Sequence, residues 1–228
     1  MDMSSQAPII TLDGPGGVGK GTISALLAEK LGWHFLDSGA LYRLTALAAI
    51  NHGVSLKDEQ AVALIAEHLD VQFVQNDTVT HIVLENEKVT EAIRTEEIGT
   101  SASIVAAYGR VRDALLKRQR AFAVMPGLVA DGRDMGTVVF PDAPLKIFMN
   151  ASAQERAKRR VKQLQQKGLL PDYDTVLADI TARDERDQSR SAAPLKPADD
   201  AILIDTTELS IEQVLDAVLE AAQQRALV

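Results

Sequence analysis

The sequence contains no cysteine, which excludes disulfide bonds and thiolate metal sites. No apolar run is long enough to span a membrane, and the opening residues MDMSSQAP lack the basic and then apolar order of a secretory signal. Repeats and low-complexity tracts are also absent. We therefore expect a cytoplasmic protein that has no membrane partner. With 228 residues, 46% hydrophobic and 25% charged, the chain is long enough to bury a substantial core within one domain.

An excess of positive charge is also missing, because the formal net charge is −8 at pH 7. General nucleic-acid binding depends on neutralising phosphates with lysine and arginine, so this balance argues against a nucleic-acid polymer as partner. Arginine nevertheless gathers in the segments RVRDALLKRQR, QERAKRR and RDERDQSR. Most such charges only solvate helix faces, but local clusters in an acidic chain also suit a small anionic ligand held at one place.

Two signatures of other function classes are missing. The four histidines, His34, His52, His68 and His81, have neither metal-ligand spacing nor a serine-and-acid arrangement, and we expect them to be structural or exposed. The guanine-reading pattern N-K-x-D does not occur in the sequence, which counts against a GTP-dependent switch.

A glycine-rich segment, DGPGGVGKGT at residues 13–22, follows the apolar run PIITLD and precedes the helical pattern TISALLAEKLG. Backbone N–H groups in such a turn can converge on one anion, as they do at a helix N-terminus. Gly14, Gly16 and Gly19 match the dinucleotide fingerprint G-x-G-x-x-G, and Asp37 lies where a ribose-binding acid would follow. A dinucleotide-binding oxidoreductase is therefore one interpretation.

The same segment also matches the P-loop pattern G-x-x-x-x-G-K through Gly14, Gly19 and Lys20. A dinucleotide has only an internal pyrophosphate and needs no lysine, so Lys20 favours a nucleoside triphosphate. The strict motif has Ser or Thr directly after the lysine, whereas Gly21 follows here and Thr22 comes one place later, near the expected metal. We predict that ATP is bound by Gly14, Pro15, Gly16, Gly17, Val18, Gly19, Lys20, Gly21 and Thr22.

Five short apolar runs alternate with helical patterns along the chain. They lie at residues 8–13, 33–37, 127–131, 145–149 and 201–205. This alternation predicts parallel βαβ units and a three-layer α/β/α fold with a five-stranded sheet. Several of the runs end in an aspartate, which either lines the ligand site at the carboxyl end of the strand or caps the next helix. These acids are Asp13, Asp37, Asp131 and Asp205.

Three stretches predict elements outside this regular alternation. Residues 70–94 alternate apolar and polar side chains around Asn76-Asp77, which indicates an inserted antiparallel hairpin. Residues 95–123 have a helical pattern with Thr95 as N-cap. Residues 151–190 predict two helices joined by a loop that contains Gly168 and Pro171, and a capping box from Ser210 to Gln213 begins the last helix.

Charged side chains gather in two of these segments. Asp131 ends a strand, as a carboxylate on the metal side would, and Arg133 and Asp134 follow it in ADGRDMG, where they can turn into a cleft. On a helix, Arg183 and Asp187 in ARDERDQSR project from one face together with the arginine at 190. Spacing alone also allows a structural row of ion pairs there, but arginine forks suit a transferred phosphoryl group.

Four stretches, DGPGGVGKGT, LDSGALYR, ADGRDMGTVVFPDAPLKIF and RDERDQSR, together resemble the bacterial cytidylate kinases, which phosphorylate CMP and dCMP from ATP. The resemblance extends from about Pro8 to the final helix and covers the predicted hairpin. It implies a single P-loop kinase domain made of a core (1–36, 106–152 and 173–228), a monophosphate-binding insertion (37–105) and a helical lid (153–172). Another small-molecule P-loop kinase is the nearest alternative.

The resemblance also implies roles for individual residues. It assigns CMP binding to Ser38, Tyr42, Arg43, Ser103, Arg112, Arg133, Asp134, Arg183, Asp187 and Arg190. The lid arginines Arg156, Arg159 and Arg160 would join the glycine loop in binding ATP. Phosphoryl transfer would depend on Lys20, Arg133, Arg183 and Arg190. Mg²⁺ is expected to arrive with ATP and to be held mostly through the phosphates and water, with Thr22 as its contact on the protein. We also expect a monomer.

Overall fold

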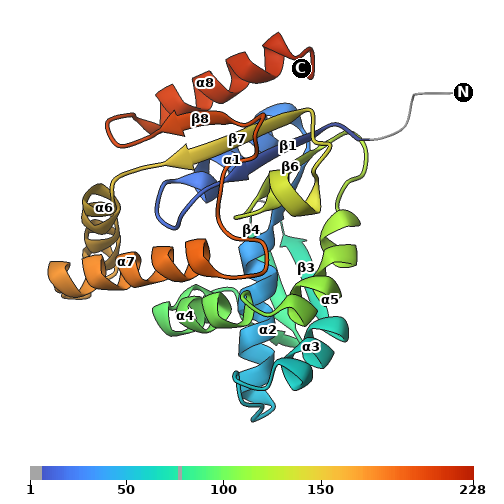
Figure 1. Cartoon of the computed structure of the whole chain (residues 1–228), viewed down its shortest axis with the longest axis vertical. Coiled ribbons are helices and arrows are strands. Elements are labelled where there is room, and N and C mark those ends of the chain that lie inside the picture. Colours follow the sequence, from blue (N-terminus) through green and yellow to red (C-terminus); the bar gives the residue numbers. More distant parts are fainter. Residues whose placement is uncertain (1–6, 77–78) are drawn as a thin grey trace, which may run out of the picture. The chain divides into compact units, whose positions relative to one another are not determined.

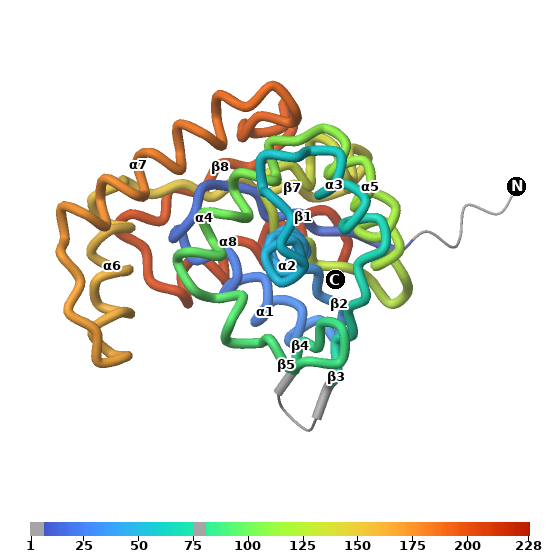
Figure 2. The backbone as a smooth tube through the Cα atoms, turned by 90° about the horizontal axis from the view of Figure 1, so that it is seen from below, coloured from blue at the N-terminus to red at the C-terminus, as the bar shows by residue number. Residues whose placement is uncertain are grey.

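The computed structural model describes residues 7–76 and 79–228, and the chain forms two compact units. Unit 1 contains the described chain as far as Asp37 and again from Gln119 to Val228. Unit 2 is the intervening segment Ser38–Arg118. Figures 1 and 2 show the helices and strands of both units. No helix within the described ranges combines the length and the apolar character that crossing a membrane requires.

Unit 1 is built on a five-stranded parallel sheet in the order β2-β6-β1-β7-β8, of which Figure 1 labels β6, β1, β7 and β8. Its strands are β1 (Ile9–Asp13), β2 (His34–Asp37), β6 (Leu128–Asp131), β7 (Leu145–Asn150) and β8 (Ile202–Asp205). Each lies within a predicted apolar run except for the last residue of β7, so the predicted parallel sheet is confirmed. Leu12 on β1 pairs with Asp131 on one side and Ile147 on the other. The carboxyl ends of these three central strands therefore meet at one edge, where ligands bind in such sheets.

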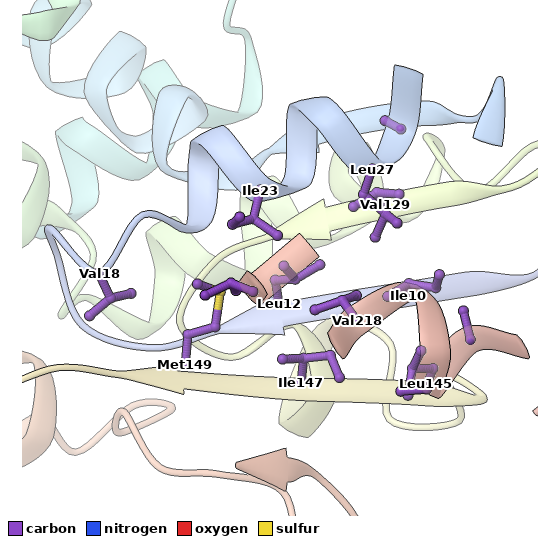
Figure 3. Close-up of a cluster of buried hydrophobic side chains, with 14 of the residues drawn as sticks. Ile10, Leu12, Val18, Ile23, Leu27, Val129, Leu145, Ile147, Met149 and Val218 are labelled. Atoms are coloured by element: carbon purple, nitrogen blue, oxygen red, sulfur yellow. The ribbon is translucent and has the colours of Figure 1, made fainter. Parts of the chain in front are cut away.

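Helices α1 (Lys20–Leu31) and α8 (Ile211–Gln224) pack together and against this sheet. Their apolar side chains join those of β1, β6 and β7 in one buried cluster (Figure 3). The largest fully buried members are Ile10, Leu12, Ile23, Leu27 and Leu145. Burying a side chain of this size stabilises the fold by roughly 1.5–3 kcal/mol. The glycine loop is thus attached to a rigid strand at one end and to a rigid helix at the other.

The predicted helix boundaries of unit 1 are largely confirmed. Helix α1 ends at Gly32, whose φ of 65° is left-handed, and α8 begins with the capping box of Ser210 and Gln213. Helices α6 (Ala153–Gln166) and α7 (Tyr173–Ser189) pack side by side, as Figure 1 shows, and Gly168 and Pro171 lie between them. One detail differs from the expected row of side chains on one helix face. Arg190 is the extended C-cap of α7, with φ −60° and ψ 140°, and does not belong to its helical face.

Unit 2 contains the predicted antiparallel hairpin, formed by β3 (Val71–Asn76) and β4 (Val79–Leu84), with a short third strand β5 (Glu87–Lys88) (Figure 2). Asp77, half of the predicted turn, lies outside the described residues. The helical part consists of α2 (Ser38–Asn51), α3 (Glu59–Glu67), the 3₁₀ turn η1 (Ala92–Arg94), α4 (Glu96–Val105) and α5 (Gly109–Arg120). The last two residues of α5 belong to unit 1.

Residues 95–123, predicted as one helix, form two. Thr95 is the N-cap of α4 as predicted, since its side chain accepts a hydrogen bond from the Ile98 N–H. The break follows because the carbonyl of Ala106 accepts from Arg112 Nη1 at 3.1 Å, while the N–H of Arg110 donates to Glu59 Oε1 at 3.1 Å. A continuous helix would join that carbonyl to that N–H. Two bonds that involve side chains, one of them from the distant Glu59, thus replace one helical bond.

We predict that Gly127→Ala destabilises unit 1, because a Cβ at this buried glycine would collide with the indole ring of Trp33. Overpacking of this kind costs about 1–3 kcal/mol. Trp33 is the only tryptophan, so urea unfolding followed by its fluorescence reports both the loss and the displaced ring. Gly109→Ala is the control, because no atom lies within 4 Å of its Cβ, and it should change stability by less than about 1 kcal/mol. Equal stabilities of the two variants would contradict this packing.

Candidate active site

The glycine loop between β1 and α1 has a backbone that only glycine adopts without strain. Gly14, Gly17 and Gly19 have φ values of 144°, 83° and 95°. Gly14 also passes so close to β7 that a Cβ there would collide with the carbonyl oxygen of Met149. Gly19 is the N-cap of α1, and because it has no side chain it supplies no capping group of its own. The first amides of α1, at the positive end of its dipole, therefore remain available for an anion.

Lys20 is a buried cation at this loop. Its side chain is 5% exposed, Nζ donates to the carbonyl of Pro15 at 2.8 Å and lies 4.0 Å from Asp131 Oδ1. Burial, with the positive charge of Arg133 acting in the same direction, lowers the pKa of Lys20 from its ordinary value of 10.5 to about 7, against the attraction of Asp131. An ammonium held in this way gains strongly from a neighbouring polyphosphate, whose negative charge restores its protonated form.

Two of the four strand-end aspartates lie at this loop. Burial raises the pKa of Asp131 to about 6, and the nearby charge of Asp37 acts in the same direction. Burial likewise raises the pKa of Asp13 to about 7, although its carboxylate accepts the backbone N–H groups of residues 135 and 136. Asp205 instead closes a local turn by accepting the N–H of Thr207 at 2.9 Å. The two alternatives for these acids, lining a site and capping a turn, thus both occur.

Arginines from two segments reach the glycine loop. A Cβ on Gly16 would lie 3.5 Å from Nη2 of Arg133 and 3.7 Å from Nη1 of Arg183. Arg133 also donates from Nε to Oδ2 of Asp187 at 3.1 Å. Burial alone would raise the pKa of Asp187, but the charges of Arg133, Arg183 and Arg190 outweigh it and hold this pKa below its ordinary value. Two neighbouring guanidinium groups beside an anion-binding loop can share the charge of a phosphoryl group.

Asp134 and Arg190 form a second, more deeply buried pair in unit 1. Nη2 of Arg190 lies 3.9 Å from Oδ1 of Asp134, and the two side chains are only 4% and 3% exposed. Nε of Arg190 donates to the carbonyl of Ala193 at 2.7 Å. Since Asp134 directly follows Arg133, the segment after β6 presents a cation and an anion at adjacent positions.

The three predicted lid arginines have different surroundings. Arg156 is buried and donates from Nη1 to the carbonyl of Gly16 at 3.0 Å, and it is also paired with Asp184 on α7. Arg159 donates to the carbonyl of Thr206 at 2.6 Å, after β8, whereas Arg160 donates to Gln163 on its own helix. Only Arg156 of these three has a hydrogen bond to the glycine loop among the described contacts. Asp184 was not identified from the sequence as a partner of Arg156, although it is adjacent in sequence to the predicted site residue Arg183.

The predicted residues of unit 2 form two small groups. Arg43 on α2 donates to the carbonyls of Ile93 and Thr95 at 2.7 and 3.2 Å. The guanidinium carbon of Arg112 lies 5.5 Å from the ring centroid of Tyr42, within cation–π range. Ser38, the first residue of α2, and Ser103 on α4 are both buried. Unit 2 therefore brings Tyr42 and Arg112 together and holds Arg43 against the start of α4.

Residues 10–224 match the family model described as cytidylate kinase. The chain belongs to the cytidylate kinase family. Curated relatives named cytidylate kinase include those of Pseudomonas paraeruginosa, 60% identical over 98% of both chains, and of Klebsiella pneumoniae, 55% identical over 99% of this chain and 100% of the relative. The relative from Photobacterium profundum is 60% identical over 93% of each chain. Membership of the cytidylate kinase family favours the P-loop interpretation of the glycine loop over the dinucleotide fingerprint.

The raised pKa of Asp13 predicts a definite pH dependence of stability. Between its ordinary pKa of 3.8 and the folded value of about 7, the folded protein holds a proton that the unfolded chain has released. The contribution of Asp13 to the free energy of unfolding is therefore full below about pH 4 and falls as pH rises toward 7. An Asn side chain does not titrate. We expect the stability of the parent protein relative to Asp13→Asn to fall by on the order of 1–4 kcal/mol across this window.

Urea unfolding of both proteins between about pH 4 and about pH 8 measures this difference. Asp205→Asn is the control, because hydrogen bonds from Thr207 hold the pKa of that exposed carboxyl below its ordinary value. Two parallel stability curves for the parent protein and Asp13→Asn would contradict a raised pKa.

Proposed function

We propose that this protein transfers the γ-phosphoryl group of ATP to CMP or dCMP and yields ADP with CDP or dCDP. The observation that carries the proposal is a buried Lys20 at the glycine loop, flanked by Arg133 and Arg183, in a member of the cytidylate kinase family. A phosphate oxygen of CMP forms a bond to the γ-phosphorus as the bond from that phosphorus to the β–γ bridging oxygen breaks. ADP leaves with the electron pair of the broken bond.

This reaction needs positioning and charge more than acid–base catalysis. The attacking phosphate oxygen is already anionic at neutral pH, so no strong general base is required. Lys20 and the loop amides would hold the β- and γ-phosphates, while Arg133, Arg183 and Arg190 would neutralise charge on the transferred group. Arg156, already hydrogen-bonded to the loop carbonyl of Gly16, would act on the ATP side. Arg159 and Arg160 are proposed to join it when the lid, residues 153–172, covers ATP.

The oxygen atoms around Lys20 fit a magnesium ion that accompanies ATP. Asp131 is a buried carboxylate, and a cation at its side would offset the burial that raises its pKa. Thr22 is an exposed residue in the first turn of α1. Hard oxygen atoms of these types are the ligands that Mg²⁺ prefers. When bound, the ion would supply charge neutralisation at the β- and γ-phosphates.

Recognition of CMP is proposed to divide among three groups of residues. Asp134 would accept a hydrogen bond from the N4 amino group of cytosine, while Arg112 and Ser103 would donate hydrogen bonds to N3 and O2. Arg183 and Asp187 would contact the sugar, and Arg43, Arg133 and Arg190 would contact the phosphate. Ser38 and Tyr42 would complete the nucleotide site within the insertion, residues 37–105. We further propose that the protein acts as a monomer in the cytoplasm.

A screen of acceptor nucleotides at fixed ATP tests this proposal. We expect CMP and dCMP to be used with specificity constants at least about 10²-fold above that of UMP, because uracil would place a carbonyl against the carboxylate of Asp134. Asp134→Asn should reduce that ratio by about 10-fold or more, because an amide can pair with either base. Asp142→Asn, at an exposed position after the same segment, is the control and should keep the parent ratio. Equal specificity constants for CMP and UMP in the parent protein would remove Asp134 from this role.

We expect Lys20→Met to lower kcat at least about 10²-fold without unfolding the protein, since the variant removes charge that stabilises the transferred phosphoryl group. Steady-state turnover with ATP and CMP measures the loss, and circular dichroism reports the fold. Lys30→Met, in the last turn of the same helix and exposed, is the matched control with normal turnover expected. Near-normal turnover of Lys20→Met would rule out the proposed role of Lys20.

A further inference from the structure

The segment after β6 is fixed to the end of β1 by three backbone N–H groups. The N–H of Gly132 donates to the carbonyl of Leu12 at 3.0 Å. The N–H groups of Met135 and Gly136 donate to Oδ1 and Oδ2 of Asp13 at 2.8 and 2.7 Å. Each oxygen of the buried Asp13 carboxylate thus takes one backbone donor, and the chain between these anchors consists of two residues.

Those two residues are Arg133 and Asp134, which the proposed function assigns to the CMP phosphate and the cytosine base. They lie between a fixed residue 132 on one side and fixed residues 135 and 136 on the other. Asp13 is also the residue directly before Gly14, where the glycine loop begins. One carboxylate therefore joins the first residue of the ATP-binding loop to the residues proposed to read the acceptor.

Close packing reinforces the same junction. A Cβ on Gly136 would lie 2.9 Å from Oγ1 of Thr11 and 3.1 Å from Cδ of Lys146. Only a hydrogen fits there without displacing one of the neighbours, so the backbone of Gly136 lies directly against β1 and β7. The short π-helical turn η2 (Met135–Val139) begins at these anchored residues and contacts β1. Asp13 thus holds the segment through hydrogen bonds, and Gly136 allows its close packing against the same strand.

We infer that Asp13 is a positioning residue for acceptor recognition: through the N–H groups of Met135 and Gly136 it fixes Arg133 and Asp134 relative to the glycine loop, and the preference for cytosine depends on it. This inference rests on the proposed function. The carboxylate offers an acceptor atom to each of two donors. An Asn side chain has one acceptor oxygen, and its amide nitrogen would face the second N–H as another donor. The substitution keeps the shape of the side chain and breaks one anchor.

The test compares Asp13→Asn with the parent protein at about pH 8, where the carboxylate of Asp13 is mostly ionised. We expect the ratio of the CMP to the UMP specificity constant to fall about 10-fold, with a higher KM for CMP and a KM for ATP within about 3-fold of the parent value. Amide hydrogen exchange of the peptide that contains residues 133–139 should accelerate. Asp205→Asn, at the end of another strand of the same sheet and also bonded to a backbone N–H, should change none of these quantities.

A purely structural role predicts a different result, because a partly unfolded enzyme loses activity toward CMP and UMP equally and keeps their ratio. Gly136→Ala provides a second variant that retains Asp13 but displaces the same segment, and it should also lower the ratio. If Asp13→Asn does not fold, the ratio measured with Gly136→Ala tests the inference in its place. A parent protein without preference for CMP would overturn the base assignment together with the inference. A parent preference that persists in the folded variants would overturn the role of Asp13 alone.

Discussion

The burial of the Lys20 ammonium beside the glycine loop is the constraint on which the arrangement of charges in unit 1 depends. Removing a cation from water is costly, and the lowered pKa of Lys20 reflects that cost. The surrounding residues offset it only in part, with the carbonyl of Pro15 at 2.8 Å and the carboxylate of Asp131 at 4.0 Å. An anion beside the ammonium would add to this compensation, and it would also pair with the first amides of α1. A polyphosphate can do both.

Other charged side chains of the site lie around the same glycine loop as Lys20. Arg133 and Arg183 bring further positive charge to Gly16, and carboxylates lie beside these cations. Asp187 pairs with Arg133, Asp184 with Arg156, and Asp134 lies beside Arg190. Arg133, Arg156 and Arg190 are thus each held by an acid on α7 or after β6, which reduces the freedom that ligand binding would otherwise have to remove. Charged groups that are held in place before a ligand arrives need less rearrangement when they stabilise its charge.

Much of this arrangement could be predicted from the sequence, and the exceptions have a common cause. The strands are short β-branched runs and the helix ends carry local caps, so β1 and the capping box of Ser210 were visible in a few neighbouring residues. The break between α4 and α5 was missed because it depends on bonds from Arg112 to Ala106 and from Arg110 to the distant Glu59. The anchoring by Asp13 joins positions more than 120 residues apart, and Asp13 could be identified only as a strand-end acid.

Anchoring through backbone N–H groups suits the task assigned to residues 133 and 134. Discrimination between cytosine and uracil depends on one donor and one acceptor being exchanged, so an error of about 1 Å in Asp134 would weaken the contact that distinguishes them. Long side chains cannot supply such precision, because each rotatable bond adds freedom. Two residues between fixed amides have little freedom, and one of the fixing groups is the residue before Gly14. The same strand end therefore sets the positions of the phosphate-binding loop and of the proposed base-reading carboxylate, which is the condition for bringing donor and acceptor into line.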